Sequence, residues 1–256
     1  MTCAGGGPLS ASFGASEVTY WSWIAGATTV PLADGIPAPT TVGTATARAL
    51  AATDILTGTR RSAYVSAAAI NSLLSFRSNV FHLQSGLVTP GGGRFKGAGW
   101  KTLWQMAISD AVLNTEAQMF VGLRNSTAAP TIVNPNTIQG YGFGHGIGEN
   151  TLKFYSRDAA GNSVVVDTGL PITTGADAFW RCGLQCDPGQ GAAANAVVRW
   201  MVEQLNTGLQ ASGVVQGAGS LSPLAQLTPS GHRNTGTVNA AAVALDMTWW
   251  RFETQL

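Results

Sequence analysis

Charged residues are scarce in this sequence. They make up 11% of the 256 residues, against about 25% in an average globular domain, and the formal net charge is +1. A general nucleic-acid-binding protein needs a basic surface and a peripheral membrane protein a polybasic cluster, so we expect neither nucleic acid nor membrane as a partner. Hydrophobic residues reach 45%, which is enough to bury a core and excludes disorder caused by low apolar content.

Cysteines and targeting signals are few as well. A secretory signal begins with a basic region, and the first basic residue here is Arg48. Cys182 and Cys186 fall in one expected strand, where they would be about 13 Å apart, whereas a disulfide needs a Cα separation of at most about 7 Å. Three cysteines cannot all pair within one chain, and no second pair of ligands suits zinc. We therefore expect three free thiols in a chain made in the cytoplasm.

Glycine is plentiful, with 32 residues, and the hydrophobic pattern has a period of two from residue 62 onward. In residues 100–109 one face carries Trp100, Thr102, Trp104, Met106 and Ile108. Residues 118–124 alternate in the same way. Turn residues between 151–156 and 163–167, and between 178–186 and 196–205, predict two hairpins, and 242–254 predicts a last strand with Val243, Leu245, Met247 and Trp249 on one side.

The N-terminal part differs in composition. Residues 1–16 are small and Gly-rich, as in an arm that orders on a partner. Residues 18–24 predict a strand with aromatic side chains on both faces, 28–46 an extended connector, and 47–55 a short helix. We expect two parts: residues 1–45 as arm and connector, which would attach to a larger particle, and residues 46–256 as one domain. That domain should be all-β, a two-layer antiparallel jelly-roll sandwich of the concanavalin-like type.

Many short segments between residues 44 and 256 resemble, in order and spacing, a family of bacteriophage virion appendages. These proteins are tail or head fibres with a concanavalin-like jelly-roll. The matching segments are Thr44-Ala-Thr-Ala-Arg48, Thr59-Arg-Arg61, Tyr64-Val-Ser-Ala-Ala68, Ile108-Ser-Asp-Ala111, Phe120-Val-Gly-Leu123, Ser126-Thr-Ala-Ala-Pro130, Val133-Asn-Pro-Asn-Thr137, Tyr141-Gly-Phe-Gly144, residues 152–166, residues 199–208, His232-Arg-Asn234, Ala242-Val-Ala-Leu-Asp246 and Phe252-Glu-Thr254.

The resemblance implies a virion structural protein: a short homotrimeric tail fibre that binds other virion proteins through its N-terminal arm and adheres to a host-surface glycan. It would be assembled in the host cytoplasm and located on the virion. Two alternatives stay open. One is a head fibre or capsid decoration protein, and the other is a free-standing, lectin-like carbohydrate-binding protein.

Catalytic patterns are missing. A retaining glycosidase needs two carboxyl groups about 5 Å apart. Glu203 has only Asp187, at a turn, on the neighbouring strand, and Asp246 and Glu253 should point to opposite faces because they are seven residues apart. His82, His145 and His232 do not accompany a serine and an aspartate in the order of a hydrolase. We expect no enzyme, no metal and no cofactor, and interpret Asp158, Asn162 and Asp187 as turn formers.

Two sets of aromatic residues are the candidate sites. Glycines alternate with Tyr141, Phe143 and His145, which indicates either a strand packed closely against another backbone or an aromatic platform for a sugar ligand. Neighbouring strand residues face opposite ways, so of Trp249 and Trp250 one belongs to the core and the other to a contact surface. The candidate subunit-interface residues are Trp21, Trp23, Trp249 and Trp250.

Overall fold

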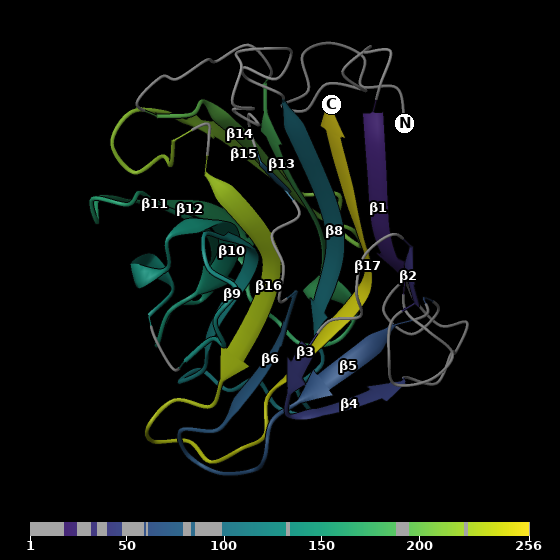
Figure 1. Cartoon of the computed structure of the whole chain (residues 1–256). Coiled ribbons are helices and arrows are strands. Elements are labelled where there is room, and N and C mark those ends of the chain that lie inside the picture. The colour runs from purple at the N-terminus through teal and green to yellow at the C-terminus, as the bar shows by residue number, and fades with distance from the viewer. Residues whose placement is uncertain are drawn as a thin grey trace.

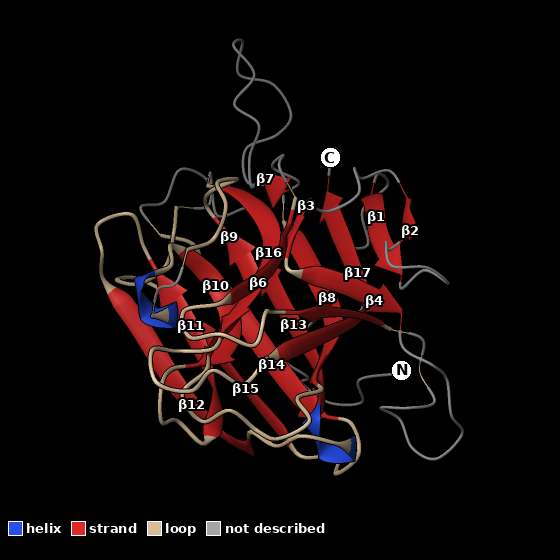
Figure 2. Cartoon of the chain, turned by 90° about the horizontal axis from the view of Figure 1, so that it is seen from below, coloured by secondary structure: helices blue, strands red, loops and turns tan. Residues whose placement is uncertain are grey.

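Two antiparallel β-sheets lie face to face in the computed structural model (Figures 1 and 2). The structure describes residues 18–24, 32–34, 40–47, 59, 61–78, 83–84, 99–131, 134–187, 195–222 and 225–255. Helix is limited there to two 3₁₀ turns, η1 (Pro135–Thr137) and η2 (Ala176–Ala178). No helix in these ranges is long and apolar enough to cross a membrane. The expected all-β sandwich of two antiparallel layers is confirmed.

The nine-stranded sheet has the order β15 (Gln210–Val215), β14 (Val198–Gln204), β13 (Phe179–Cys186), β8 (Trp100–Ile108), β17 (Ala244–Gln255), β1 (Val18–Ile24) and β2 (Leu32–Asp34), with β5 (Ser62–Val65) pairing β17 and β4 (Thr44–Ala47) pairing β5. The eight-stranded sheet has the order β12 (Ser163–Pro171), β11 (Thr151–Arg157), β10 (Gly140–His145), β9 (Gln118–Arg124), β16 (Gln226–Asn234), β6 (Leu73–Arg77) and β3 (Thr40–Val42), with β7 (Leu83–Gln84) beside β16.

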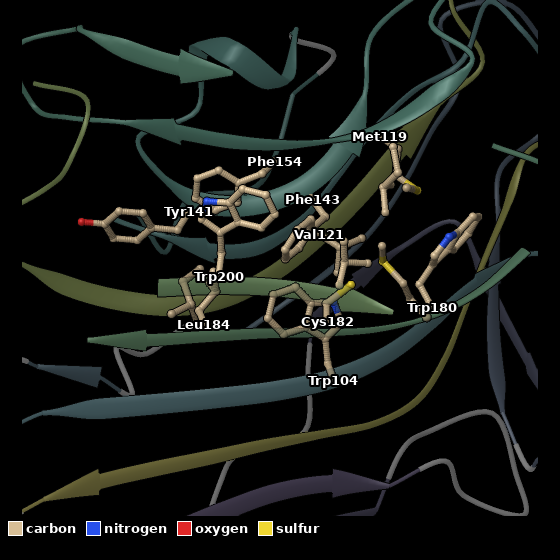
Figure 3. Packing of buried hydrophobic residues seen from close by; sticks show 14 of the residues in the cluster. Trp104, Met119, Val121, Tyr141, Phe143, Phe154, Trp180, Cys182, Leu184 and Trp200 are labelled. Atoms are coloured by element: carbon tan, nitrogen blue, oxygen red, sulfur yellow. The ribbon is translucent and has the colours of Figure 1, made fainter. Parts of the chain in front are cut away.

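Aromatic side chains fill the space between the sheets (Figure 3). The Trp104 ring stacks on Trp250 at 4.7 Å, and the Trp200 ring stacks on Phe154 of the opposite sheet at 4.9 Å. Burial of such large rings supplies most of the favourable free energy of folding, and stacked pairs add about 0.5–1.5 kcal/mol each. The sandwich is therefore held by its aromatic core rather than by charge.

One buried ion pair joins the two sheets at an end of the core. The Arg233 guanidinium of β16 donates to the Asp110 carboxylate at 2.5 Å and to the Ala244 carbonyl of β17 at 3.0 Å. The Asp110 carboxylate also accepts from the Ala244 amide at 2.7 Å. Both side chains of the pair are fully buried. A charge buried in this way is tolerated because it is paired and hydrogen-bonded.

The strands predicted from alternation are confirmed. β8 buries the five side chains expected of residues 100–108, both predicted hairpins form, and β1 spans 18–24. The connector prediction for 28–46 is wrong for its described residues, because β2, β3 and β4 form there and pair within the two sheets. The predicted arm at 1–16 lies outside the described residues, as does the helix predicted at 47–55 except for Ala47, which ends β4.

A β-bulge in β17 corrects the face assignments of the last strand. The register of β17 against β8 shifts between Met247 and Trp249. Leu245 and Met247 point to the core as predicted, but beyond the bulge Trp250 takes the core position and Trp249 the outer one. For the same reason Asp246 and Glu253 both lie on the outer face, opposite Ala107 and Lys101, which contradicts the expectation that they face opposite ways.

Candidate functional site

The residues predicted as a sugar platform lie inside the protein. Tyr141, Phe143 and His145 share one face of β10, as expected, but that face points into the core and each is at most 1% exposed. Figure 3 shows Tyr141 and Phe143 between the sheets. The Tyr141 hydroxyl accepts from the Leu221 amide at 2.7 Å and lies 2.9 Å from the Ser220 hydroxyl. The assignment of these three residues to an exposed platform is therefore corrected, because the core takes that face of the strand.

The alternating glycines have the structural role that was the other interpretation. A Cβ on Gly142 would lie 2.7 Å from both the Phe120 ring and the Val121 carbonyl of β9. Gly122 of β9 stands directly opposite Gly142. Strands β9 and β10 can approach each other, and the Phe120 ring can lie over β10, only because these positions lack side chains.

The four tryptophans predicted at an interface separate into different environments. Trp250 is fully buried in the core, so its assignment to a contact surface is wrong. Trp249 is partly exposed on the outer face of the nine-stranded sheet. Trp21 and Trp23 lie in β1, where Trp23 pairs with Trp250 in the backbone register. The prediction of an interface stays open for Trp21, Trp23 and Trp249.

A cluster of polar side chains lies on the outer face of the eight-stranded sheet, the face that points away from the core. Directly paired residues share a face, so the register places His232 of β16 beside Ser75 of β6, and Ser230 of β16 beside Arg77 of β6. On the other side of β16, Arg124 of β9 stands opposite Thr228 on that face. We call Ser75, Arg77, Arg124, Ser230 and His232 the His232 cluster.

Several polar atoms of the His232 cluster are buried without a hydrogen-bond partner. They are both ring nitrogens of His232, the hydroxyls of Ser75 and Ser230, and Nε of Arg124. A buried polar group without a partner costs about 1–3 kcal/mol, and native proteins contain few of them. Five such atoms on one face of three adjacent strands are therefore a feature that packing alone does not explain.

The two arginines of the cluster hold a segment of chain over this face. Nε of Arg77 donates to the Thr127 carbonyl at 3.0 Å, and Nη1 of Arg124 donates to the Ala128 carbonyl at 3.2 Å. Because β6 and β9 flank β16, residues 125–131 cross the outer face at the His232 cluster. Both guanidinium groups are partly exposed, whereas Ser75, Ser230 and His232 are fully buried.

The electrostatic environment of the cluster is positive. Burial, and then the neighbouring Arg77, lowers the pKa of the Arg124 guanidinium from its ordinary value. Burial, followed by the charge of Arg124, lowers the pKa of His232 to about 3. His232 is consequently neutral at pH 7, with one ring nitrogen as a donor and the other as an acceptor.

Aromatic side chains border the cluster. The Phe120 ring stacks on the His232 ring with centroids 6.0 Å apart, and Phe120 packs with Ile138 and Tyr155 in a small cluster of its own. The Tyr155 hydroxyl donates to the Glu149 carboxylate at 2.7 Å, which also pairs with Lys153 at 2.6 Å. Flat apolar rings are therefore buried next to unpartnered polar atoms on the outer face.

Sequence reasoning missed this cluster. His232 was noticed as one of three histidines, but its neighbours come from strands that are far apart in the chain. The only local signal was the small and polar composition of Ser230-Gly-His232, where the Cβ of an added side chain at Gly231 would meet the Phe76 ring. The pairing of β16 with β6 and β9 was needed to bring the residues together.

In the described ranges, the two acidic residues considered as catalytic candidates, on β14 and directly after β13, are paired with arginines, and the cysteines are buried. No group of three or more His, Cys, Asp or Glu there could hold a metal ion. The Glu203 carboxylate pairs with Arg181 at 3.4 Å and Asp187 pairs with Arg199 at 3.2 Å. Cys182 and Cys186 are free and buried, and burial raises the pKa of the Cys182 thiol well above its ordinary value.

Comparisons with known proteins show the fold. The sequence matches no protein-family model and no curated protein. Among solved structures, peanut lectin is similar with a TM-score of 0.56 and 11% identity, covering 94% of this chain and 98% of that one. Arcelin-5, a lectin-like defence protein from Phaseolus vulgaris, has a TM-score of 0.54 and 11% identity over 93% and 99% of the two chains.

A third similar structure is lectin UEA-II in complex with galactose, with a TM-score of 0.53 and 10% identity over 94% of this chain and 99% of that chain. All three similarities extend over nearly the whole of both chains, and all three structures are lectins or lectin-like rather than phage fibres. At this level of identity the likeness concerns the fold. The chain has the concanavalin-like jelly-roll fold of the legume lectins.

Proposed function

We propose that the protein binds a carbohydrate, without catalysis, at the His232 cluster. The observation that carries the proposal is the set of buried polar atoms without partners on one face of β6, β9 and β16. Sugar hydroxyls both donate and accept hydrogen bonds, so one sugar could bond to the neutral imidazole of His232 and to the hydroxyls of Ser75 and Ser230 together. These side chains are fully buried, so binding requires residues 125–131 to move off this face. The fold supports this proposal, since a lectin of the same fold has been solved with galactose.

The aromatic side chains that border the cluster can pack against the apolar C–H face of a sugar ring. The C–H face of a pyranose packs on flat apolar rings, and aromatic side chains with a few placed polar groups are the usual lining of small-molecule sites. Phe120 and Tyr155 stand on the same face as His232, one and three strands away from β16. A sugar at this place would meet hydroxyl-binding groups on one side and rings on the other.

Binding rather than hydrolysis is proposed because Asp246 and Glu149 are engaged in ion pairs, and because Asp246 and Glu253 are too far apart to act together. Asp246 pairs with Arg61 at 2.6 Å on the outer face of the nine-stranded sheet, and Glu149 pairs with Lys153 and Tyr155. Asp246 and Glu253 share a face but stand opposite Ala107 and Lys101, six residues apart on β8, which is about 20 Å. A glycosidase needs two carboxyl groups about 5–10 Å apart.

The test uses serine variants that remove a polar atom without a partner. Ser230→Ala and Ser75→Ala should leave the free energy of unfolding unchanged or raise it by about 1 kcal/mol, because an unsatisfied buried hydroxyl disappears. Each should weaken glycan binding, measured on a glycan array and by isothermal titration calorimetry.

Ser220→Ala is the matched control. Its buried hydroxyl donates to the Ala196 carbonyl at 2.6 Å, so the variant should lose stability and keep its affinity. Binding to no glycan by the wild-type protein, or equal binding by wild type and both serine variants of the cluster, contradicts the proposal.

The setting in which binding would be used is a virion appendage, as head or tail fibre. Its support is the ordered set of segments that resemble phage fibres, including Phe120-Val-Gly-Leu123 and His232-Arg-Asn234, which lie on the two central strands of the proposed site. Detection of the chain by mass spectrometry in purified virions tests this setting. Its absence from particles, with glycan binding retained, favours a free-standing lectin.

A further inference from the structure

Arg77 and Arg124 contact backbone carbonyls, whereas four other arginines of this chain pair with carboxylates. Arg61, Arg181, Arg199 and Arg233 each pair with a carboxylate within 4.0 Å. Arg77 and Arg124 have no carboxylate partner within the described ranges; their hydrogen bonds go to the Thr127 and Ala128 carbonyls. Two guanidinium groups therefore share one face of the sheet with no negative side chain paired to either.

The register brings the two charges to the same place. Arg77 stands beside Ser230 on one side of β16, and Gly122 stands beside Ser230 on the other. Arg124 is two residues further along β9 on the same face, opposite Thr228 of β16. Arg77 is close enough to Arg124 to depress the pKa of the Arg124 guanidinium.

We infer that the His232 cluster recognises an acidic sugar, whose carboxylate or sulfate group takes the place of the Thr127 and Ala128 carbonyls at the guanidinium groups of Arg77 and Arg124. Residues 125–131 then move off the face, and the sugar hydroxyls reach the side chains of Ser75, Ser230 and His232 that are buried beneath them. This inference rests on the proposed function and adds the chemical class of the ligand. An anion between two guanidinium groups removes their mutual repulsion and gains charge-assisted hydrogen bonds, which are shorter and about twice as strong as neutral ones. A planar guanidinium fits a carboxylate or sulfate by two parallel bonds.

Neutral His232 fits a sugar better than a bare anion. Its pKa of about 3 means that the ring adds no third positive charge at pH 7. A small inorganic anion would satisfy the arginines and leave the imidazole nitrogens and the serine hydroxyls without partners. A sugar acid supplies the charge and the hydroxyls in one molecule.

The experiment compares matched acidic and neutral ligands on the full chain. Isothermal titration calorimetry with oligogalacturonate, sulfated galactan and a neutral galactose oligomer, at low ionic strength, should show at least about tenfold tighter binding of one acidic oligomer. That preference should fall as salt is raised, because partly exposed charges are screened. Arg77→Gln and Arg124→Gln should each weaken acidic binding about tenfold and leave neutral binding unchanged.

Arg199→Gln is the control, because Arg199 is on the other sheet and pairs with the partly exposed Asp187. Thermal unfolding of every variant checks that the fold is intact. Equal affinity for acidic and neutral oligomers overturns this inference and leaves the proposed function standing. No binding of any oligomer overturns both. Inorganic sulfate that competes as well as the acidic oligomer shows an adventitious ion only and also overturns it.

Discussion

Two buried histidines lie on opposite faces of the eight-stranded sheet. His145 points into the core from β10 and His232 points outward from β16, and both are essentially inaccessible to solvent. Burial lowers the pKa of each to about 3, with Arg233 adding to the effect at His145 and Arg124 at His232. In the folded protein both rings are neutral over the whole physiological pH range.

These histidines make stability depend on pH. An unfolded histidine takes up a proton near pH 6.5, whereas the folded protein takes it up only near pH 3. Below pH 6.5 the unfolded state therefore binds more protons, and the free energy of unfolding decreases as the pH is lowered, by about 1.4 kcal/mol per pH unit for each histidine. Urea unfolding between pH 7.5 and 5 should show this slope for two groups.

Single substitutions show which histidine causes the pH dependence of the free energy of unfolding. His145→Gln and His232→Gln should each reduce the pH dependence by about one proton between pH 6.5 and 5. Carboxylates with a lowered pKa, such as Glu149 and Asp167, also lower the stability when they are protonated, but only below about pH 4.5, outside this window. Phe154→Leu is the control, since it loosens the core and should keep the slope. A wild-type slope in both histidine variants would show that the rings are protonated in the folded state.

At the scale of elements, the contact of β9 with β10 depends on the absence of side chains. Gly142→Ala would bring a Cβ to 2.7 Å from the Phe120 ring and the Val121 carbonyl. The carbonyl belongs to the neighbouring strand and has little freedom to move. The substitution should lower the free energy of unfolding by about 1–3 kcal/mol, as measured by urea denaturation.

Gly146→Ala is the comparison for this prediction. An added Cβ there would meet the Glu149 carboxylate at 3.3 Å, which is the far end of a flexible side chain. Its effect should stay below about 1 kcal/mol. Equal losses in the two variants would mean that the close approach of β9 and β10 has no energetic importance.

The strands differ in how well the sequence predicts them. β8 has large apolar residues at every second position, so its core face follows from alternation alone. β17 follows it only as far as Met247, because the bulge depends on its partner strand. The sequence does not predict β16, since Pro229 and Gly231 are unusual in a central strand. It does not predict the His232 cluster either, because the cluster depends on the register of β16 with two strands that are distant in the sequence.

At the scale of the whole molecule, apolar side chains stay exposed at one end of the sandwich. Val112 and Val238 are each 76% exposed and Ile70 is 50% exposed, on loops joined by hydrogen bonds from Asn71 to Gly236 and from Asn114 to Thr235. Trp249 adds partial exposure on the nine-stranded sheet. Exposed apolar surface of this kind marks contact surfaces.

We predict a stable trimer with Trp21, Trp23 and Trp249 between chains. Light scattering coupled to gel filtration should give three times the chain mass of 26.4 kDa at micromolar concentration. Trp249→Gln should shift the mass toward the monomer, because interface tryptophans carry much of the binding energy. Val165→Thr, at an exposed position of β12 on the outer face of the other sheet, should leave the mass unchanged. A monodisperse monomer in the wild type would rule out the trimer.

The pairing of β1 with β17 has a mechanical consequence. Val18 stands opposite Gln255, so the two strands nearest the chain ends are neighbours and emerge at the same end of the sheet. A load applied across these two points would pull the ladder apart one pair at a time, like a zipper, instead of shearing all its hydrogen bonds together. Such a molecule yields at low force when pulled by both ends. If each chain of an assembly were pulled through only one of its ends, the β1–β17 ladder would carry no force.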